Sequence, residues 1–276
     1  MTPNDTKAVF KLVASDLDGT LLTPNHQVSD LTKQTLQQLH LQGITFAFAT
    51  GRHHIDVAGI REQVGIPAYM ITSNGARVHD ANDNLLYSNN VPEHLVQSII
   101  NVVQDDPEMK VHVYQGDQWL LNQEDEVIRQ FHNESGFNYQ LFDSEQAPCT
   151  NIAKIFFTHP SHDHDHLVEY EKKLNDTFGD QIYVVFSTPW CLEVMAAGVS
   201  KGEALKAVAR QLTYKLEDCI AFGDGMNDVE MLSMAGKGLV MGSAHHKVFD
   251  ALPNQEIIGT NSEEAVAQYL RQHILV

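Results

Sequence analysis

Short apolar runs alternate with amphipathic stretches over the first third of the chain. The apolar runs are typical of buried strands, and the positions between them repeat with the period of a helix. We expect strands at residues 9–15, 44–50 and 69–75 and helices at residues 29–43 and 53–64. This β-α-β-α-β order predicts a parallel sheet whose strands present their carboxyl ends at one edge. The polar residues that follow the strands, Asp16, Thr50 and Ser73-Asn74-Gly75, should therefore lie close together.

The pattern changes between residues 85 and 189. After a hairpin that turns at Asn82-Asp83-Asn84, helical stretches alternate with short strands rich in β-branched and aromatic residues. The α/β alternation returns after residue 190, beginning with an expected strand at residues 191–196. We therefore predict a parallel-sheet core, residues 1–84 and 190–276, that is interrupted by an α+β domain at residues 85–189.

Composition narrows the class of protein. The 276 residues include 43% hydrophobic residues, enough for a buried core, and the formal net charge of −18 argues against a surface for nucleic acid or anionic lipid. The 3 cysteines include no C-x-x-C pair, which fits a reducing compartment. Neither a signal-like start nor an apolar run of membrane-spanning length is present. We expect a cytoplasmic protein without nucleic-acid or membrane partners, and the sequence leaves its oligomeric state open.

Two aspartates, Asp16 and Asp18, stand one residue apart in the stretch VASDLDGTLL, where the first apolar run ends. Crowded carboxylates cost free energy, so such a pair usually shares a cation, a proton or a reaction. An EF-hand calcium loop is excluded, because its required positions hold Thr20, Leu21 and Gln27. From these residues alone, a turn in which an aspartate caps nearby amides is an equal alternative.

A second acidic stretch, GDGMND at residues 223–228, also follows an apolar strand and precedes a helix. Asp224 and Asp228 supply carboxylates, and Asn227 supplies an amide. Oxygen donors that meet at strand ends with room for water suit Mg²⁺. A lone GDG is usually a tight turn, but two acidic stretches at one edge of the same sheet favour a magnesium site.

Lys201 and Thr50-Gly51 are candidates for contacts with an anion. In VSKGEAL, Ser200 and Glu203 have capping-box spacing, which places Lys201 in the first turn of a helix. A cation is disfavoured there unless an anion lies beside it, and without one the lysine is an ordinary surface residue. In ATGR, Thr50 and Gly51 offer a hydroxyl and an open backbone amide to a phosphoryl oxygen.

Five ordered motifs, DLDGTLL, TGR, SNGA, SKGEAL and GDGMND, with a long insert before the lysine, resemble the haloacid dehalogenase (HAD) superfamily. The resemblance covers nearly the whole chain and is closest to the Cof-type phosphatases with a C2B cap. It implies an α/β fold, with a Rossmann-like HAD core and an inserted α+β cap. It also implies a Mg²⁺-dependent phosphatase that hydrolyses small phosphorylated metabolites, such as sugar phosphates and pyridoxal phosphate.

The same resemblance implies roles for individual residues. Asp16 would be the nucleophile that forms an aspartyl-phosphate, and Asp18 would be the general acid and base. Mg²⁺ would bind the Asp16 carboxylate, the Asp18 backbone carbonyl, Asp224 and, directly or through water, Asp228. The phosphoryl oxygens would be held by Thr50, Gly51, Lys201, Asn227 and the backbone amide of Leu17. Arg52 and Asn74 are candidates for contact with the substrate or the cap.

Departures from the family pattern lie at Ser243 and Glu264-Ala265, where such enzymes more often have Asn and Asp-Gly. These positions bear on the substrate rather than on the chemistry. Two other functions stay open. One is a phosphomutase or phosphotransferase of the same fold, and the other is a non-catalytic sensor of phosphorylated ligands, which would not require Asp18.

A histidine-rich stretch, SHDHDH at residues 161–166, is not expected to hold a metal ion. On a helix, His162 and His166 share a face while His164 points away, so the three imidazoles cannot close one tetrahedral site. We expect Ser161 to cap a helix there instead.

Overall fold

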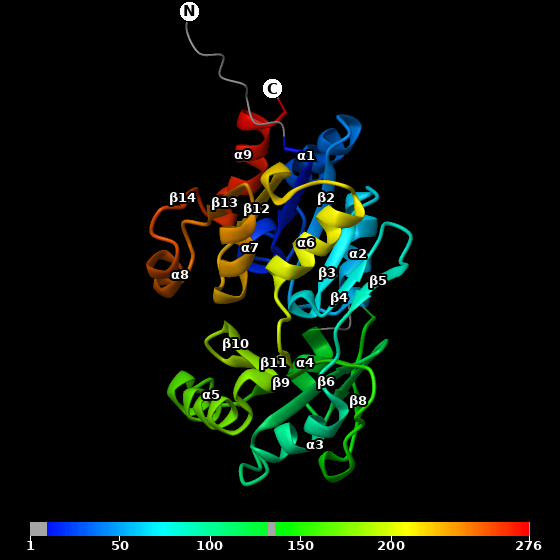
Figure 1. Cartoon of the computed structure of the whole chain (residues 1–276), viewed down its shortest axis with the longest axis vertical. Coiled ribbons are helices and arrows are strands. Elements are labelled where there is room, and N and C mark those ends of the chain that lie inside the picture. Colours follow the sequence, from blue (N-terminus) through cyan, green and yellow to red (C-terminus); the bar gives the residue numbers. More distant parts are fainter. Residues whose placement is uncertain (1–9, 132–135, 276) are drawn as a thin grey trace, which may run out of the picture.

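The computed structural model describes residues 10–131 and 136–275, which form two β-sheets stacked along the long axis of the molecule (Figure 1). The strands of the larger sheet are β1 (Leu12–Ser15), β2 (Thr45–Ala49), β3 (Tyr69–Thr72), β4 (Arg77–His79), β5 (Leu85–Ser88), β12 (Cys219–Gly223), β13 (Lys237–Val240) and β14 (Glu256–Ile257). Their order is β14-β13-β12-β1-β2-β3-β4-β5. The β3–β4 and β4–β5 pairs are antiparallel, and the other pairs are parallel. The expected α/β fold with a parallel sheet is confirmed.

Helices cover both faces of the larger sheet. The helices are α1 (Asp30–Leu41), α2 (His54–Val64), α6 (Lys201–Gln211), α7 (Val229–Met234), α8 (His246–Ala251) and α9 (Ala265–His273). Because side chains alternate along a strand, Val13 and Phe46 pack on one face with α1, α2 and α9. Leu12 and Ala47 pack on the other face with α6, α7 and α8. The central strands are therefore buried on both sides, and functional groups are confined to their ends.

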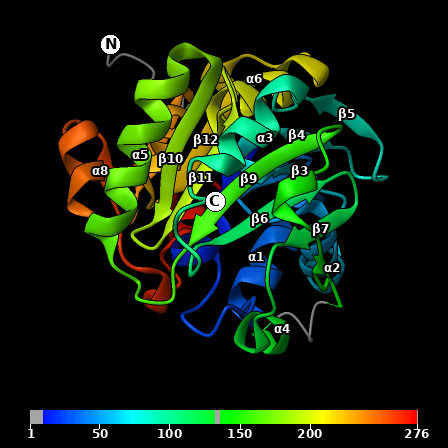
Figure 2. The ribbon, with the colours of Figure 1, turned by 90° about the horizontal axis from the view of Figure 1, so that it is seen from below.

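The smaller sheet forms the inserted part of the molecule. Its strands are β6 (Lys110–Gln115), β7 (Gln118–Leu121), β8 (Gln140–Leu141), β9 (Ile152–Thr158), β10 (Ile182–Thr188) and β11 (Cys191–Ala196), in the order β10-β11-β9-β6-β7-β8. On the side away from the larger sheet lie α3 (Glu93–Asn101) and α5 (His164–Phe178) (Figures 1 and 2). A short helix, α4 (Glu126–Phe131), follows β7. Tyr114, Trp119 and Phe156 form an aromatic cluster on the opposite face, which is turned toward the larger sheet.

Two strands lie on the other side of the predicted domain boundaries at residues 85 and 189. Residues 191–196 do form a strand, but β11 pairs with β9 and β10 in the smaller sheet, with Glu193 opposite Phe156. The expected hairpin is present, and it keeps β5 beside β4 in the larger sheet. An apolar run predicts a strand but does not identify its partner, so the pattern could not assign β11. Since β5 belongs to the larger sheet and β11 to the smaller sheet, the insert lies between residues 89 and 196.

The start of α5 also differs from the prediction. Asp163, not Ser161, is the N-cap, and its side chain accepts hydrogen bonds from the backbone N–H groups of Asp165 and His166. The Ser161 hydroxyl instead contacts His159 Nδ1 at 2.6 Å. The prediction that Ser161 caps this helix was therefore wrong.

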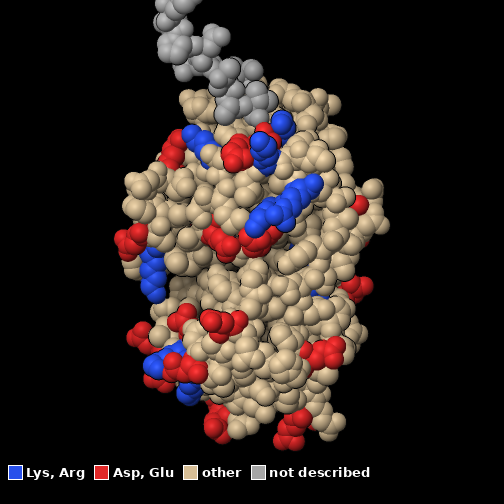
Figure 3. All heavy atoms as spheres, in the orientation of Figure 1, with Lys and Arg blue, Asp and Glu red and all other residues tan. Residues whose placement is uncertain are grey.

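The surface carries many acidic groups. Figure 3 shows Asp and Glu side chains spread over both parts of one face, as expected from the net charge of −18. Among the described residues, no helix is both long and apolar enough to cross a membrane.

Candidate active site

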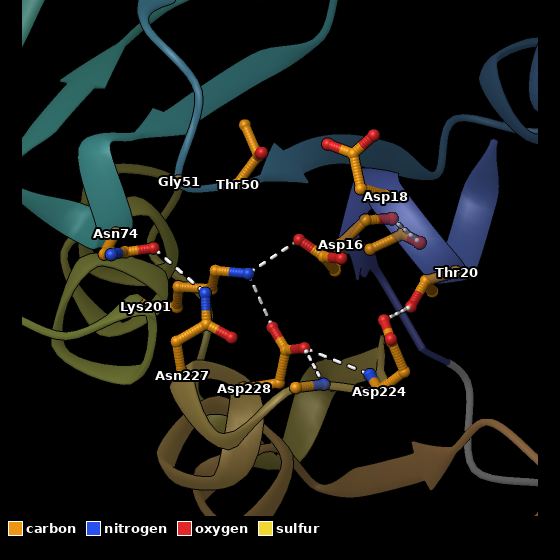
Figure 4. Close-up of polar contacts among 12 residues, drawn as sticks. Asp16, Asp18, Thr20, Thr50, Gly51, Asn74, Lys201, Asp224, Asn227 and Asp228 are labelled. Carbon is orange, nitrogen blue, oxygen red and sulfur yellow. Dashed lines mark hydrogen bonds and ion pairs between the residues drawn. The ribbon is translucent and has the colours of Figure 1, made fainter. Parts of the chain in front are cut away.

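The carboxyl ends of the central strands meet at the edge of the larger sheet that faces the smaller sheet, and Figure 4 shows the polar residues that follow these strands. Asp16 follows β1, Thr50 follows β2, Asn74 follows β3 and Asp224 follows β12. Asp16, Thr50 and Asp224 line one cleft of about 550 Å³, together with groups from the smaller sheet. The expectation that Asp16, Thr50 and residues 73–75 lie close together is confirmed for Asp16 and Thr50, which line this cleft, and Asn74 adjoins them because its backbone N–H donates to the Thr50 carbonyl at 3.0 Å.

A tight turn after β1 allows both Asp16 and Asp18 to face the cleft. Gly19 has a φ of 81°, in the left-handed region that favours glycine. A Cβ atom at Gly19 would come within 2.4 Å of Asp224 Oδ2, so a side chain here would collide with the second acidic stretch. The turn thereby joins the two acidic motifs, and the Thr20 hydroxyl donates a hydrogen bond to Asp224 Oδ1 at 2.7 Å.

Lys201 connects the two acidic motifs from the start of α6. Its Nζ donates to Asp16 Oδ1 at 2.6 Å and to Asp228 Oδ1 at 2.7 Å, and its side chain is 0% exposed (Figure 4). The Ser200 side chain caps α6 by accepting from Glu203 N–H, which fixes the first turn as the motif predicts. Burial opposes the charge on Lys201, yet the two carboxylates raise its pKa above the usual value. Lys201 is therefore a fixed, buried ammonium and not a surface lysine.

The carboxylates around Lys201 are crowded and shielded from water. Burial raises the pKa of Asp16 well above its usual value, and the charges of Asp228 and Asp224 add to this effect while Lys201 opposes it. Burial and the charge of Asp228 raise the pKa of Asp224 to about 6. Carboxylate oxygens of Asp16, Asp224 and Asp228 all lie within 4.8 Å of one another. Such a group of oxygen donors is one that a hard cation stabilises.

Asp228 already has several hydrogen-bond donors. Its Oδ2 accepts from the backbone N–H groups of Asp224 at 3.0 Å and Gly225 at 2.9 Å, while Oδ1 accepts from Lys201. These bonds hold the loop that carries Asp224 in place. The arrangement favours an indirect role for Asp228 at a cation, through water or through the loop.

Asp18 is held in a separate ionic contact. Arg52 donates to both of its oxygens, from Nε at 2.7 Å and Nη2 at 2.5 Å, and His26 Nδ1 lies 2.9 Å from Oδ1. Burial acts to raise the pKa of Asp18, but the hydrogen bonds and charges of His26 and Arg52 outweigh it and hold the pKa well below its usual range. Asp18 is therefore ionised in this conformation.

A second buried lysine links the smaller sheet to the strand ends. Lys154 of β9 donates to the Gly51 carbonyl at 2.7 Å and to Glu193 Oε1 at 2.5 Å. Glu193 of β11 also accepts a hydrogen bond from the Asn74 amide. The Asn74 side-chain oxygen in turn accepts from Asn227 Nδ2 at 3.0 Å. These contacts connect the smaller sheet to the polar residues at the strand ends of the larger sheet.

The structure also places the other residues that the sequence singled out. Leu17 is buried in the core behind the site, and the Thr50 hydroxyl accepts a hydrogen bond from the Arg52 amide at 3.2 Å. Asn74 contacts the smaller sheet, and Arg52 contacts Asp18.

Sequence reasoning missed His26, Lys154 and Glu193. Lys154 and Glu193 carried a usable signal, because each is a charged residue inside an otherwise apolar strand pattern, AKIFFTH and CLEVMA. A buried strand tolerates such a charge only with a partner. For His26, which lies in a loop with a φ of 57°, no comparable signal is present.

Comparisons with known proteins agree with this geometry. A family profile described as haloacid dehalogenase-like hydrolase matches residues 13–270. The chain is 49% identical over 263 residues to a Haemophilus influenzae protein named as a phosphatase, which covers 95% of this chain and 96% of that protein. It is 40% identical over 260 residues to the HMP-PP phosphatase of Cronobacter sakazakii, with 94% of each chain covered.

Solved structures of proteins with the same fold support this family assignment. A haloacid dehalogenase-like hydrolase from B. subtilis has a TM-score of 0.83 at 27% identity, over 96% of this chain and 99% of that chain. A HAD subclass IIB sugar phosphatase has a TM-score of 0.82 at 22% identity, over 96% of this chain and 100% of that chain, which shows a shared fold. The chain therefore belongs to the haloacid dehalogenase-like hydrolases.

Proposed function

We propose that this hydrolase, a phosphatase like the relatives it matches, uses Mg²⁺ and an aspartyl-phosphate intermediate to hydrolyse small phosphorylated metabolites. The observation that carries the proposal is the buried contact of Lys201 with Asp16 and Asp228, next to Asp224 and at the end of β1. Buried like charges around one ammonium are costly to keep, and they are typical of a site that handles charge during a reaction.

The donor set fits Mg²⁺. Carboxylate oxygens of Asp16 and Asp224 are hard ligands, they lie within 4.8 Å of each other, and both groups have pKa values raised by burial and neighbouring charge. The Asp18 backbone carbonyl would complete the protein ligands, and Asp228 would act through water. Bound there, Mg²⁺ would offset the repulsion between the Asp16 carboxylate and an anionic phosphate.

Asp16 would be the nucleophile. One of its carboxylate oxygens would attack phosphorus, and the bond between phosphorus and the leaving oxygen would break. The Lys201 ammonium would move from pairing carboxylates to stabilising the phosphoryl oxygens, assisted by Asn227, Thr50, the amide of Gly51 and the backbone N–H of Leu17. Hydrogen bonds already position Asn227 and Thr50 before substrate binds, so among these side chains only Lys201 has to exchange a partner.

Asp18 would carry the proton in both half-reactions. It would give a proton to the leaving oxygen, and it would then take one from the water that attacks the phosphorus of the aspartyl-phosphate. The contact with Arg52 keeps Asp18 ionised, the state needed for the second step. The first step requires protonated Asp18, so Arg52 must loosen its contact when substrate enters.

The cleft suits a small substrate with a flat or hydroxylated leaving group. Its volume is about 550 Å³, and it is lined by Tyr114 and Phe156 of the smaller sheet and by Trp190 of the turn between β10 and β11, beside Lys154 and Glu193. Sugar phosphates and pyridoxal phosphate are the substrates we propose to test first. HMP-PP joins them because a relative is named for its hydrolysis. The cytoplasmic location stays a prediction.

Phosphate release tests the proposal. The native protein and Asp16→Asn would be compared on a panel of sugar phosphates, pyridoxal phosphate, HMP-PP and nucleotides, with Mg²⁺ or with EDTA. We expect metal-dependent release that falls by at least about 10⁴-fold in Asp16→Asn. Release that persists without metal and in the variant would contradict the proposal. Transfer of phosphate to a second sugar hydroxyl would identify a phosphotransferase, and binding without release would identify a sensor.

A further inference from the structure

A second cluster of possible metal ligands lies in the inserted part, away from the cleft. Asp106 lies between α3 and β6, His159 follows β9, and His166 is in the first turn of α5. One ligand atom from each lies within 4.8 Å of the other two. The cluster lies at the start of α5, a helix that covers the side of the smaller sheet away from the larger sheet (Figure 2).

Both imidazoles direct the same ring nitrogen at one carboxylate. His166 Nε2 lies 2.7 Å from Asp106 Oδ2, and His159 Nε2 lies 3.8 Å from Asp106 Oδ1. The side chains of Asp106 and His159 are only 13% and 11% exposed, whereas His166 is 33% exposed and leaves a route from solvent. Donors on a tetrahedral zinc ion lie about 3.3 Å apart, so modest side-chain rotations close the site.

Neighbouring groups orient these ligands. The other ring nitrogen of His159, Nδ1, contacts the Ser161 hydroxyl at 2.6 Å and accepts a hydrogen bond from the Ser161 backbone N–H at 3.2 Å, so that Nε2 is directed at Asp106. The Tyr170 hydroxyl donates to Asp106 Oδ2 at 3.3 Å. These contacts fix the orientation of the His159 ring. Binding a metal ion through Nε2 would place the proton of the neutral imidazole on Nδ1, where the Ser161 hydroxyl, in place of the Ser161 N–H, would be its partner.

The donor types select the metal. Two imidazoles with one carboxylate match Zn²⁺, whereas Mg²⁺ prefers oxygen ligands alone. A fourth position is available to water or to Glu108, whose carboxylate lies 3.9 Å from His159 Nε2 and is 72% exposed. This set is distinct from the SHDHDH trio, because it uses only His166 from that stretch and adds two residues from other elements.

We propose that Asp106, His159 and His166 form a Zn²⁺ site that joins the loop before β6 to the start of α5. The ion stabilises the inserted part, because it binds the folded arrangement and not the separated segments.

Zinc binding by the full chain without a histidine tag tests this proposal. Zn²⁺ would be titrated against a chromogenic chelator in excess Mg²⁺, which keeps the active-site carboxylates occupied. His159→Gln and His166→Gln remove one ligand each. His162→Gln is the matched control, since His162 is exposed and stacks on Trp190 with ring centroids 5.9 Å apart.

We expect one zinc ion per native chain, with binding at least about tenfold weaker in each ligand variant and unchanged in His162→Gln. Zinc should raise the melting temperature of the native chain and of the control only. Co²⁺ should give the intense visible absorption of a tetrahedral site in the same two proteins. If His159→Gln does not fold, the more exposed His166→Gln decides alone. Absence of zinc binding, or binding that both ligand variants retain, would overturn the proposal and leave a hydrogen-bonded cluster only.

Discussion

The two halves of the cleft each contain a buried lysine, and the two lysines differ in their surroundings. On the side of the larger sheet, Lys201 at the start of α6 pairs with Asp16 and Asp228 near the strand ends, where the proposed reaction takes place. In the smaller sheet, Lys154 pairs with Glu193 and lies over the rings of Tyr114 and Phe156. On the side of the larger sheet, the charged groups are those of the proposed reaction. On the side of the smaller sheet, the cleft is lined by aromatic rings and by the Lys154–Glu193 ion pair. We infer that the first half sets the chemistry and the second selects the substrate.

Lys201→Met should have the largest effect. It removes the cation between two buried carboxylates, so we expect kcat to fall by at least about 10²–10³-fold and the free energy of unfolding to fall by about 3–5 kcal/mol. Steady-state kinetics and urea unfolding at fixed Mg²⁺ measure the two effects. Lys206→Met is the control, because Lys206 makes a partly exposed pair with Glu203 and should change stability by less than about 1 kcal/mol. Near-native activity in Lys201→Met would contradict the inference that the side of the larger sheet sets the chemistry.

The Lys154–Glu193 pair should affect stability and substrate choice more than chemistry. Both side chains are 3% exposed, so breaking the pair in Lys154→Met or Glu193→Gln should cost about 3–5 kcal/mol, and the double variant should cost less than the sum. The ranking of substrates by kcat/KM should change, while kcat on the best substrate changes less than about tenfold. Urea unfolding and the phosphate-release panel measure these outcomes. A loss of kcat as large as in Lys201→Met would show that the smaller sheet takes part in the chemistry.

Arg52→Met should change the pH dependence of the reaction. Without the guanidinium, the pKa of Asp18 rises toward its usual value, and a larger fraction of Asp18 is protonated at a given pH. Because the first step requires the protonated acid, the alkaline limb of kcat/KM should move to higher pH. The lowered pKa of Asp18 also stabilises the native fold above the unfolded pKa of an aspartate, and at neutral pH Arg52→Met loses the part of that contribution that Arg52 supplies, while the part from His26 remains. If the pH profile does not change, Arg52 does not control the protonation of Asp18, and contact with the substrate would be its role instead.

His79→Leu should give the smallest effect, outside both halves of the site. Burial, the largest influence, lowers the pKa of His79 to about 4, so the folded protein binds fewer protons than the unfolded chain between about pH 4 and 6.5. Stability therefore decreases as pH falls through this window. In the variant, the slope of the unfolding free energy against pH should be smaller over this window, by an amount that corresponds to at most about one bound proton. A slope in His79→Leu equal to that of the native protein would contradict this assignment.

The sequence predicted the larger-sheet half of the site better than the other half. Asp16, Asp224 and Lys201 each lie in a local motif at a strand end or a helix start, and parallel strands bring such ends together. The contact between Lys154 and Glu193 joins residues 39 positions apart through the pairing of β9 with β11, and local pattern carries no information on pairing. The same limit put residues 191–196 in the wrong sheet.

The ionic contact of Asp18 was also beyond sequence reasoning. The motif suggested an acid for proton transfer, but it could not show that Arg52 and His26 keep the side chain ionised. That property depends on side-chain positions fixed by tertiary packing. The same holds for the histidine-rich stretch, because His166 contacts Asp106 of another element, a partner that the local pattern does not identify.

Capture of the covalent intermediate tests the central claim most directly. Asp18→Asn cannot remove a proton from the attacking water, and p-nitrophenyl phosphate has a leaving group that departs without an acid, so the intermediate should accumulate. The variant would be mixed with this substrate and Mg²⁺, quenched in acid, digested and examined by mass spectrometry. We predict one added phosphoryl group on the peptide containing Asp16, absent with EDTA and absent in Asp16→Asn/Asp18→Asn. A phosphoryl group on another residue, or turnover without any labelled peptide, would contradict the account.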